Sequence, residues 1–397
     1  MALRPIYVVA LVGVLCAAAW VWQPWQPDRR HFFDVMSTVE AAPEGVATLS
    51  SAAAGIHPKI VAQNLKLPWD IAFLSDTEAL VTEKAGAMYR VDLATGTKQA
   101  VAGMPSVRVQ GQGGLHAVLL HPNFAENGLL YLSYAAPPPD GNGATTHFLR
   151  AKLTGTQLTD QKLLLQAKAP TGAGQHFGGA MAFDRDGYLF VSVGDRGTRE
   201  DAQKLTSHNG KILRLHDDGR VPKDNPFVDT PGAMPEIWSY GHRNPQGLSF
   251  DPLTGALYEA EHGPQGGDEI NRIERGRNYG WPVITYGREY GTGFKIGEGT
   301  TRKDVPPPVH YYVPSIATAG IAYYAADLFP QWKHSVFVAS LRGHLNRVQL
   351  TADGRFVKEE RLLTDAGLRV RAVRVSPKGE IYVVADDGVI LRLDKSR

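Results

Sequence analysis

Cysteine is almost absent from this sequence of 397 residues, since Cys16 is the only one. If the N-terminal segment that holds Cys16 is removed, the chain has no thiol and can form neither an intramolecular disulfide nor a cysteine metal site. An excess of charge of one sign is also absent, because the formal net charge is only +2. The composition therefore predicts no nucleic-acid partner.

Two common catalytic motifs are missing as well. The chain contains neither a His-Glu-x-x-His pattern nor a Gly-x-Ser-x-Gly pattern. The usual metalloprotease and serine-hydrolase mechanisms therefore have no support in the sequence. No long amphipathic helix is evident, and residues 201–205 are a candidate for a short helix.

The N-terminus differs in character from the rest of the chain. Arg4 precedes an apolar run at residues 6–22, with alanine at positions 17–19. This pattern is typical of a secretory signal, and an uncleaved membrane anchor is the alternative. We therefore expect residues 1–22 to be a signal peptide or an N-terminal membrane anchor, and the protein to be periplasmic or otherwise exported. Residues 23–58, rich in alanine, proline and polar residues, predict a linker or loosely ordered arm.

Glycine and proline are abundant, with 42 and 26 residues, and indicate many turns between short strands. From residue 67 onward one pattern recurs six times: a short apolar strand, a turn of Asp, Pro, Asn or Gly, and a second apolar strand. The first strands of the six units include residues 71–73, 118–120, 181–183, 248–250, 321–323 and 373–375.

Six such units predict an all-β fold over residues 59–397, namely a six-bladed β-propeller of four-stranded antiparallel blades. One unit cannot bury both faces of its sheet alone, whereas stacking around an axis does so and leaves only short edges. A β-sandwich or another all-β barrel is the alternative, and the presence of six similar units favours the propeller.

Unusual polar residues fall at equivalent places in these units. His176 precedes the turn of the third unit by about ten residues and Asp195 follows it by about nine, so the two should lie side by side. In the fourth unit Arg243 and Asn244 stand in the same relation to residues 262–264. Equivalent positions in other units hold Gln112, Arg342, Arg369 and Arg371. These residues should gather on one face of the disc, where converging loops commonly form a site.

Each of these features has a structural and a functional interpretation. A histidine paired with a carboxylate is a common general base, but His176 and Asp195 could also be a structural loop pair. Arg369 and Arg371 should point the same way from one strand, which favours an anionic ligand between them. The alternative is that they pair with Asp386 or with the neighbouring Asp387. Residues 278–282 predict an ordered loop in which Trp281 is a packing anchor.

The order and spacing of these segments resemble the soluble PQQ-dependent aldose and glucose dehydrogenases. The resemblance extends over about residues 67 to 393. The shared segments are residues 111–115, 175–179, 193–195, 241–247, 263–264, 268–271, 278–282 and 369–371. The resemblance implies that the protein oxidises aldose sugars at the anomeric carbon to lactones and passes the electrons to an external acceptor.

The resemblance also implies a role for each matching residue. His176, oriented by Asp195, would take the proton of the anomeric hydroxyl, and Arg243 would stabilise negative charge on the quinone oxygen of PQQ. The residues implied to hold PQQ, which carries three carboxylates, are Gln112, His176, Arg243, Asn244, Arg342, Arg369 and Arg371. The carbonyls of Gly263 and Pro264 would bind a Ca²⁺ that contacts PQQ, and Glu269 with the carbonyl of Tyr279 would bind a second Ca²⁺.

Two positions depart from the glucose enzymes. Arg342 stands where lysine is common, and residues 312–315 lack an expected tryptophan, so the shape of the sugar pocket differs. Two other functions compete with the dehydrogenase. A calcium-dependent lactonase on a similar propeller needs carboxylates around the axis, whereas this chain has arginines there. A non-catalytic propeller that binds carbohydrate or protein would not need His176, Asp195 and Arg243.

Overall fold

The computed structural model describes residues 47–51, 54–138 and 141–396. The expected signal or anchor at residues 1–22, and residues 23–46 of the expected arm, lie outside the described residues. No helix within the described residues is long and apolar enough to cross a membrane.

Six antiparallel sheets make up the described part of the chain. The first three are β3 (Pro68–Phe73), β4 (Glu78–Glu83), β5 (Met88–Asp92) and β6 (Lys98–Ala100); β7 (Leu115–Leu120), β8 (Leu129–Ala136), β9 (Thr145–Thr154) and β10 (Gln157–Gln166); and β11 (Met181–Phe183), β12 (Leu189–Val193), β13 (Lys211–Leu215) and β14 (Ile237–Tyr240).

The other three sheets follow in chain order. They are β15 (Pro245–Phe250), β16 (Leu257–Glu261), β17 (Asp268–Ile273) and β18 (His310–Tyr312); β19 (Thr318–Tyr324), β20 (Ser335–Ser340), β21 (His344–Leu350) and β22 (Phe356–Leu362), with β1 (Ala47–Thr48) added in parallel; and β23 (Val370–Val375), β24 (Ile381–Ala385) and β25 (Val389–Lys395), with β2 (Ile56–Ala62) as the fourth strand.

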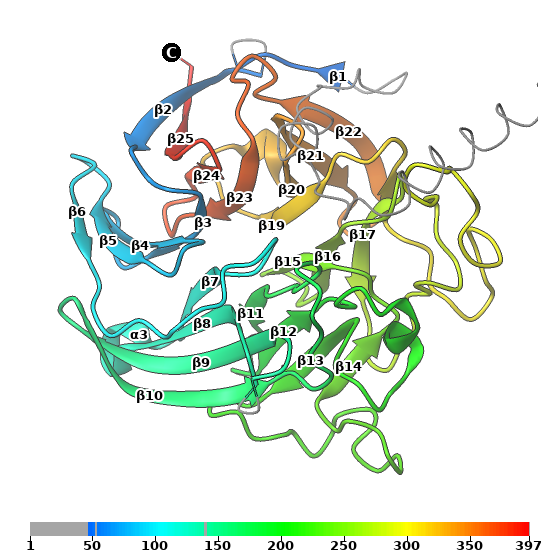
Figure 1. The fold of residues 1–397 in the computed structure, drawn as a ribbon. Coiled ribbons are helices and arrows are strands. Elements are labelled where there is room, and N and C mark those ends of the chain that lie inside the picture. The colour runs from blue at the N-terminus through cyan, green and yellow to red at the C-terminus, as the bar shows by residue number, and fades with distance from the viewer. Residues whose placement is uncertain (1–46, 52–53, 139–140, 397) are drawn as a thin grey trace, which may run out of the picture. The chain divides into compact units, whose positions relative to one another are not determined.

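These sheets are the blades of a six-bladed β-propeller, as the sequence predicts. The first strand of each blade contacts that of the next, in the closed order β3, β7, β11, β15, β19, β23 and back to β3. Figure 1 shows these strands around the centre and β6, β10 and β14 at the rim. The six predicted hairpins are the two inner strands of the six blades, for example Ile71 of β3 beside Val81 of β4.

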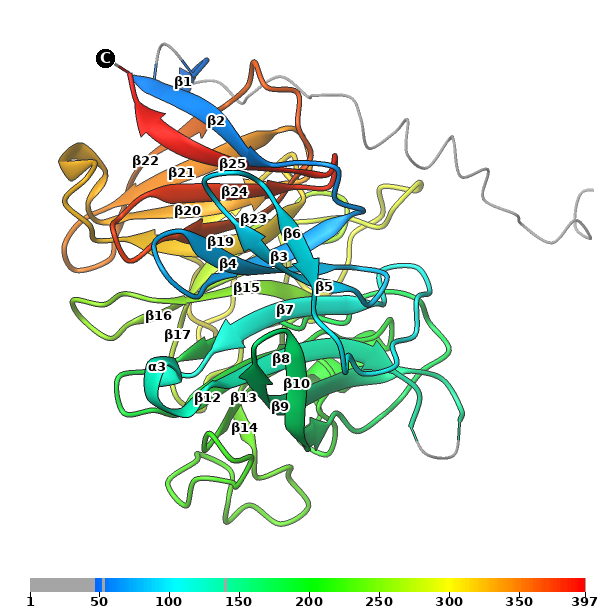
Figure 2. The same cartoon turned by 90° about the vertical axis from the view of Figure 1, so that its left-hand side faces the viewer.

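The N-terminal strand completes the last blade. Ile56–Ala62 (β2) pairs with the C-terminal β25, and Figure 2 shows these two strands, blue and red, side by side. The propeller therefore begins before residue 59, and the expected arm is wrong at its C-terminal end, because residues 56–58 are strand and residues 47–48 pair with β22. Joining the two ends of the chain in one blade closes the ring.

Apolar side chains on both faces of the blades form the core. In β20, Val336 and Val338 pack toward the fourth blade with Ile321, whereas Phe337 and Ala339 pack toward the sixth. Alternate residues of a strand point to opposite faces, so a strand buried on both sides is apolar throughout. This packing holds the ends of the inner strands, and the loops that leave them, at defined positions.

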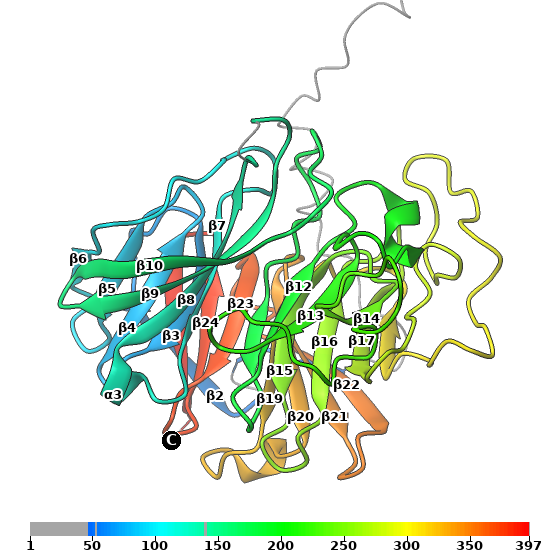
Figure 3. The ribbon, with the colours of Figure 1, turned by 90° about the horizontal axis from the view of Figure 1, so that it is seen from below.

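Helices are few and short in the described residues: α3 (Phe124–Asn127) and the 3₁₀ turns η1 (Arg199–Gln203) and η2 (Pro330–Trp332). The short helix predicted at residues 201–205 corresponds to η1, which begins two residues earlier. The longest connection, between β17 and β18, is the yellow loop at the side of the strands in Figure 3.

Candidate active site

One end of the propeller collects the loops that precede the first strand of each blade and follow the second. The chain enters β7, β11, β15 and β23 from this end and leaves β12, β16, β20 and β24 there. All the predicted site residues lie in these loops or beside them: Gln112, His176, Asp195, Arg243, Asn244, Gly263, Pro264, Glu269, Tyr279, Arg342, Arg369 and Arg371. The hairpin geometry of the blades therefore brings distant parts of the chain to one end.

His176 and Asp195 lie side by side, as hairpin geometry predicts. His176 Nδ1 is 2.6 Å from Asp195 Oδ1, and the Asp195 side chain is buried. Burial lowers the pKa of His176 below its usual 6.5, the charge of Arg243 lowers it further, and Asp195 opposes both. His176 is therefore neutral at pH 7, as a proton acceptor must be.

The carboxylate of Asp195 stays ionised although it is buried. Burial acts to raise its pKa, but the hydrogen bond and charge of His176, the charge of Arg243 and a backbone amide outweigh burial and leave the pKa below the usual 3.8. The amide is that of Gly197, whose N–H donates to Oδ1 at 2.8 Å. The indole Nε1 of Trp281 donates to Oδ2 at 2.8 Å.

The backbone of His176 has a rare conformation. Its φ is +55°, in the left-handed region that a residue with a side chain seldom adopts. Its N–H donates to Gln112 Oε1 at 2.8 Å, and Gly194 packs directly against its carbonyl. A Cβ on Gly194 would stand 2.2 Å from that oxygen and 2.9 Å from Asn244 Oδ1. Gly194 therefore leaves the space that the backbone of His176 needs.

Replacing Gly194 by alanine should displace His176 and reduce turnover. A misplacement of about 1 Å at a reacting group can lower kcat by about 10², and we expect a loss of that order for Gly194→Ala, together with a lower Tm because the clash is with backbone atoms. Gly172→Ala is the matched control, because a Cβ there meets nothing within 4 Å. Equal kcat in both variants would contradict this role of Gly194.

Arg243 and Asn244 lie next to the pair formed by His176 and Asp195, and both carry buried donors. Arg243 Nη1 donates to the carbonyl of Gly263 at 2.7 Å, and the backbone N–H of Arg243 donates to Glu261 Oε2 at 2.6 Å. Arg243 Nε and Asn244 Nδ2 are buried and have no acceptor among the described residues. An acceptor-rich ligand would satisfy both donors, since an unpaired buried polar group is costly.

Arg369 and Arg371 point to the same place, where Asp386 lies between them. Arg369 Nε donates to Asp386 Oδ2 at 2.8 Å, and Arg371 donates to both oxygens at 2.8 and 2.9 Å. The pairing with Asp386 considered from the sequence is therefore present, and one carboxylate faces two cations. Lys84 is a third cation near this pair. Burial is the main cause that lowers its pKa, and the charges of Arg371 and Arg369 lower it further.

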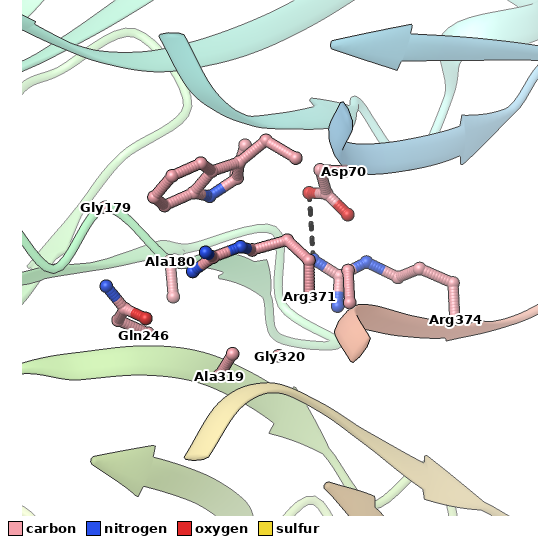
Figure 4. Close-up of a pocket in the computed structure, with 11 residues that line it drawn as sticks. Asp70, Gly179, Ala180, Gln246, Ala319, Gly320, Arg371 and Arg374 are labelled. Carbon is pink, nitrogen blue, oxygen red and sulfur yellow. Dashed lines mark hydrogen bonds and ion pairs between the residues drawn. The ribbon is translucent and has the colours of Figure 1, made fainter. Parts of the chain in front are cut away.

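Arg371 also lines a cavity along the propeller axis. Its guanidinium lies over the ring of Trp69, 4.4 Å from the ring centre. Figure 4 shows the guanidinium of Arg371 turned toward Gln246, whereas Arg374 points to Asp70. The Arg374–Asp70 pair is 2.9 Å long and Asp70 is buried. Arginines line this cavity, and a ring of carboxylates does not. This arrangement disfavours a lactonase.

Three of the four expected calcium ligands, Gly263, Glu269 and Tyr279, line a second cavity together with Arg243, whereas Pro264 is not among its lining residues. The carbonyl of Gly263 already accepts the hydrogen bond of Arg243, and Pro264 O is 3.5 Å from Ser315 Oγ. A cation at these two carbonyls would therefore share the Gly263 oxygen with the guanidinium of Arg243 and be repelled by its charge.

Buried carboxylates make the Glu269 side of this cavity suitable for a cation. Burial and the charge of Glu261 raise the pKa of Glu269 to about 8 and raise that of Glu259 as well. Glu259 Oε1 and Asn271 Oδ1 are buried acceptors without a donor in the described part of the chain. His242, Glu259 and Glu261 also offer ligand atoms within 4.8 Å of one another. A hard cation with oxygen ligands fits this donor set.

Three residues near the site were not assigned a role from the sequence. Trp281, expected only as a packing anchor, is buried and also bonds Asp195. Glu261 bonds the backbone of Arg243 and belongs to the carboxylate cluster. Tyr290 is 64% exposed as a residue, but its hydroxyl lies near Arg243 and Arg342, where local desolvation raises its pKa and both cations act to lower it. Of these three residues, only Glu261 has a feature in the sequence that could have indicated a role. It is a charged residue two positions after Glu259 in an otherwise apolar strand.

Comparison with known proteins agrees with this arrangement. A family model described as glucose/sorbosone dehydrogenase matches residues 65–392. Aldose sugar dehydrogenase YliI of Escherichia coli (strain K12) is 39% identical over 346 residues, which cover 86% of this chain and 93% of that protein. The solved structure of the soluble aldose sugar dehydrogenase Asd from E. coli, in its apo-form, has 38% identity and a TM-score of 0.82, covering 86% of this chain and 99% of that one.

A solved structure with cofactor is also similar. The PQQ-bound aldose sugar dehydrogenase from Streptomyces coelicolor has 29% identity and a TM-score of 0.70, with 85% of this chain and 98% of that one covered. The fold, the site and these relatives together define an oxidoreductase of the propeller type. The chain belongs to the glucose/sorbosone dehydrogenase family.

Proposed function

We propose that this protein is a PQQ-dependent dehydrogenase that oxidises aldoses at the anomeric carbon to lactones and passes the electrons to an external acceptor. The observation that carries this proposal is the neutral His176, held by the ionised Asp195, next to the buried unpaired donors of Arg243 and Asn244. A base and an anion-stabilising group in contact are what this reaction requires of the protein.

His176 acts as the base. Asp195 accepts a hydrogen bond at Nδ1, which places the imidazole proton there and leaves the lone pair on Nε2. Nε2 takes the proton of the anomeric hydroxyl while the C1–H bond breaks and C1 becomes a carbonyl. PQQ, when bound, supplies the carbonyl carbon that accepts the hydride from C1. The imidazolium formed on His176 is stabilised by Asp195.

The cations at this end of the propeller bind and polarise the cofactor. Arg243 Nε and Asn244 Nδ2 are the buried donors available to quinone or carboxylate oxygens. Arg369, Arg371 and Arg342 supply charge for carboxylates, with Asp386 offsetting part of it. Gln112 uses its side-chain oxygen to hold His176, so its amide nitrogen remains for the ligand.

We further propose that a Ca²⁺ binds Glu269 and the carbonyl of Tyr279, and that Glu261 and Glu259 contribute charge. The buried acceptors without donors support this site. A second Ca²⁺ at the carbonyls of Gly263 and Pro264 is proposed only together with a movement of Arg243. Export through residues 1–22 is likewise a proposal, supported by the sequence pattern alone.

Calcium should stabilise the fold through Glu269. A ligand that binds only the folded state at about a hundred times its Kd contributes about 2.7 kcal/mol, so adding Ca²⁺ to chelator-treated protein should raise the Tm. Glu269→Gln should remove most of this rise. Glu274→Gln is the control, because Glu274 lies nearby on the surface, 58% exposed. A Ca²⁺-induced rise that survives in Glu269→Gln would place the ion elsewhere.

A dye-reduction assay on the purified protein tests the proposed function. The assay uses a panel of aldoses, with and without added PQQ and Ca²⁺. We expect reduction that requires both PQQ and sugar. A folded protein that neither binds PQQ nor reduces dye would contradict the proposal, and hydrolysis of lactones by that protein would identify a lactonase instead.

A further inference from the structure

Trp281 contacts Asp195, the partner of His176, but forms no hydrogen bond with His176 itself among the described residues. Its side chain is buried and packs with Ala202 and Ile296. The indole Nε1 donates to Asp195 Oδ2 at 2.8 Å, while Oδ1 of the same carboxylate accepts from His176 Nδ1. The two oxygens thus have separate donors, and the indole prevents rotation of the carboxylate away from His176.

A second set of hydrogen bonds fixes Trp281. Gln203 Nε2 donates to the carbonyl of Trp281 at 2.7 Å and to Asn278 Oδ1 at 3.0 Å, and Asn278 Nδ2 donates back to Gln203 Oε1 at 2.8 Å. The backbone N–H of Trp281 donates to the carbonyl of Gly241 at 2.9 Å. Its position is therefore set by residues from two blades.

The ring of Trp281 also lies beside two positively charged side chains, those of Arg243 and Arg199. The guanidinium carbon of Arg243 is 5.3 Å from the ring centre and that of Arg199 is 5.6 Å away. One side chain therefore contacts both the carboxylate that orients the base and the arginine that stabilises negative charge.

We propose that Trp281 is a positioning residue of this active site, which holds Asp195 in the orientation that makes His176 a base and holds Arg243 beside it. The proposal rests on the proposed function, because it concerns the proton transfer through His176. It goes beyond packing, since a packing role alone needs the ring and not its N–H group. The N–H donor is therefore the part to test.

Loss of the donor has a predictable direction. The charged and titratable groups that face His176 are Asp195, Arg243, Arg196 and His262. Of these only Asp195 favours the protonated imidazole, and the indole N–H partly neutralises Asp195. Without that N–H, Asp195 attracts the proton of His176 more strongly, so the pKa of His176 should rise. A freely rotating carboxylate should also orient the imidazole less well.

The test compares Trp281→Phe, which keeps a ring and removes the N–H, with Trp332→Phe, a buried tryptophan of η2 that stacks on Phe329. The first readout is the pKa of His176, measured by NMR titration of the imidazole in the protein without PQQ. We expect a rise of about one unit in Trp281→Phe and none in Trp332→Phe. The second is kcat, which should fall about tenfold with KM and PQQ affinity nearly unchanged.

A second variant keeps the proposal testable if Trp281→Phe does not fold. Gln203→Ala removes the support of Trp281 and leaves the indole in place, so it should cause a smaller shift in the same direction. An unchanged pKa of His176 in the folded variants would overturn the positioning role. Because this readout needs no cofactor or sugar, its failure is distinct from a failure of the proposed function, which the dye assay on the unaltered protein reports.

Discussion

His176→Ala should abolish sugar oxidation and leave PQQ binding largely intact. His176 is the base that we propose, neutral and next to Asp195, and a positioned general base contributes about 10² to 10⁴ to the rate. We expect the loss of kcat to lie toward the upper end of that range, because His262, a half-buried histidine near His176, is already held by a hydrogen bond with Gln246. PQQ should still bind, since the arginines and Asn244 remain.

The measurement is single-turnover oxidation of an aldose, together with PQQ binding by calorimetry. His216→Gln is the matched control, because His216 follows β13 at the opposite end of the blade and packs at a tilt against Tyr188. His176→Ala with kcat within tenfold of the unaltered protein would assign the proton transfer to another group. Loss of PQQ binding in this variant would mean that His176 mainly holds the cofactor.

Arg243→Ala should lower kcat by about 10² to 10³, the effect of removing one group that stabilises developing negative charge. Arg243 is buried, its Nε has no acceptor among the described residues, and its charge lowers the pKa of His176. Its loss should therefore also raise the pKa of His176 toward the usual value. The acid limb of the pH profile of kcat/KM should move to higher pH, because the base is then protonated at a pH where it was neutral.

Arg243→Lys separates charge from geometry, since lysine keeps the charge but cannot bond both Gly263 and a ligand in the same way. Its activity should lie between those of Arg243→Ala and the unaltered protein. Arg355→Ala is the control, because Arg355 pairs with Asp353 on the exposed turn between β21 and β22. A pH profile that does not move in Arg243→Ala would show that its charge does not act on His176.

Local patterns were sufficient to predict the blades. Each inner hairpin consists of two apolar strands joined by a turn of Asp, Pro or Gly. Residues 71–73 and 79–81, which are close in sequence, are therefore predicted to pair as antiparallel strands. The same symmetry predicts that His176 meets Asp195. Both inferences need only distances along one hairpin, where strand pairing leaves little freedom.

Contacts between distant segments could not be predicted in this way. Closure of the last blade joins Ile56 to Lys395, and Trp281 meets Asp195 across 86 positions. Neither pair has a local sequence signal, because both depend on how complete blades pack around the axis. The β15–β16 hairpin predicts that Arg243 lies beside residues 262–264, but its hydrogen bond to the carbonyl of Gly263 could not be predicted, since backbone acceptors leave no trace in a sequence.

We propose that PQQ bound among Arg243, Asn244 and the paired arginines is reduced by an aldose whose proton goes to His176. The most direct test is an anaerobic titration of the PQQ-loaded protein with an aldose in the absence of any acceptor, followed by absorbance. We expect one equivalent of sugar per bound PQQ to convert the spectrum of the oxidised quinone to that of the reduced form, with lactone as the product. An unchanged spectrum in a protein that has bound PQQ would contradict it.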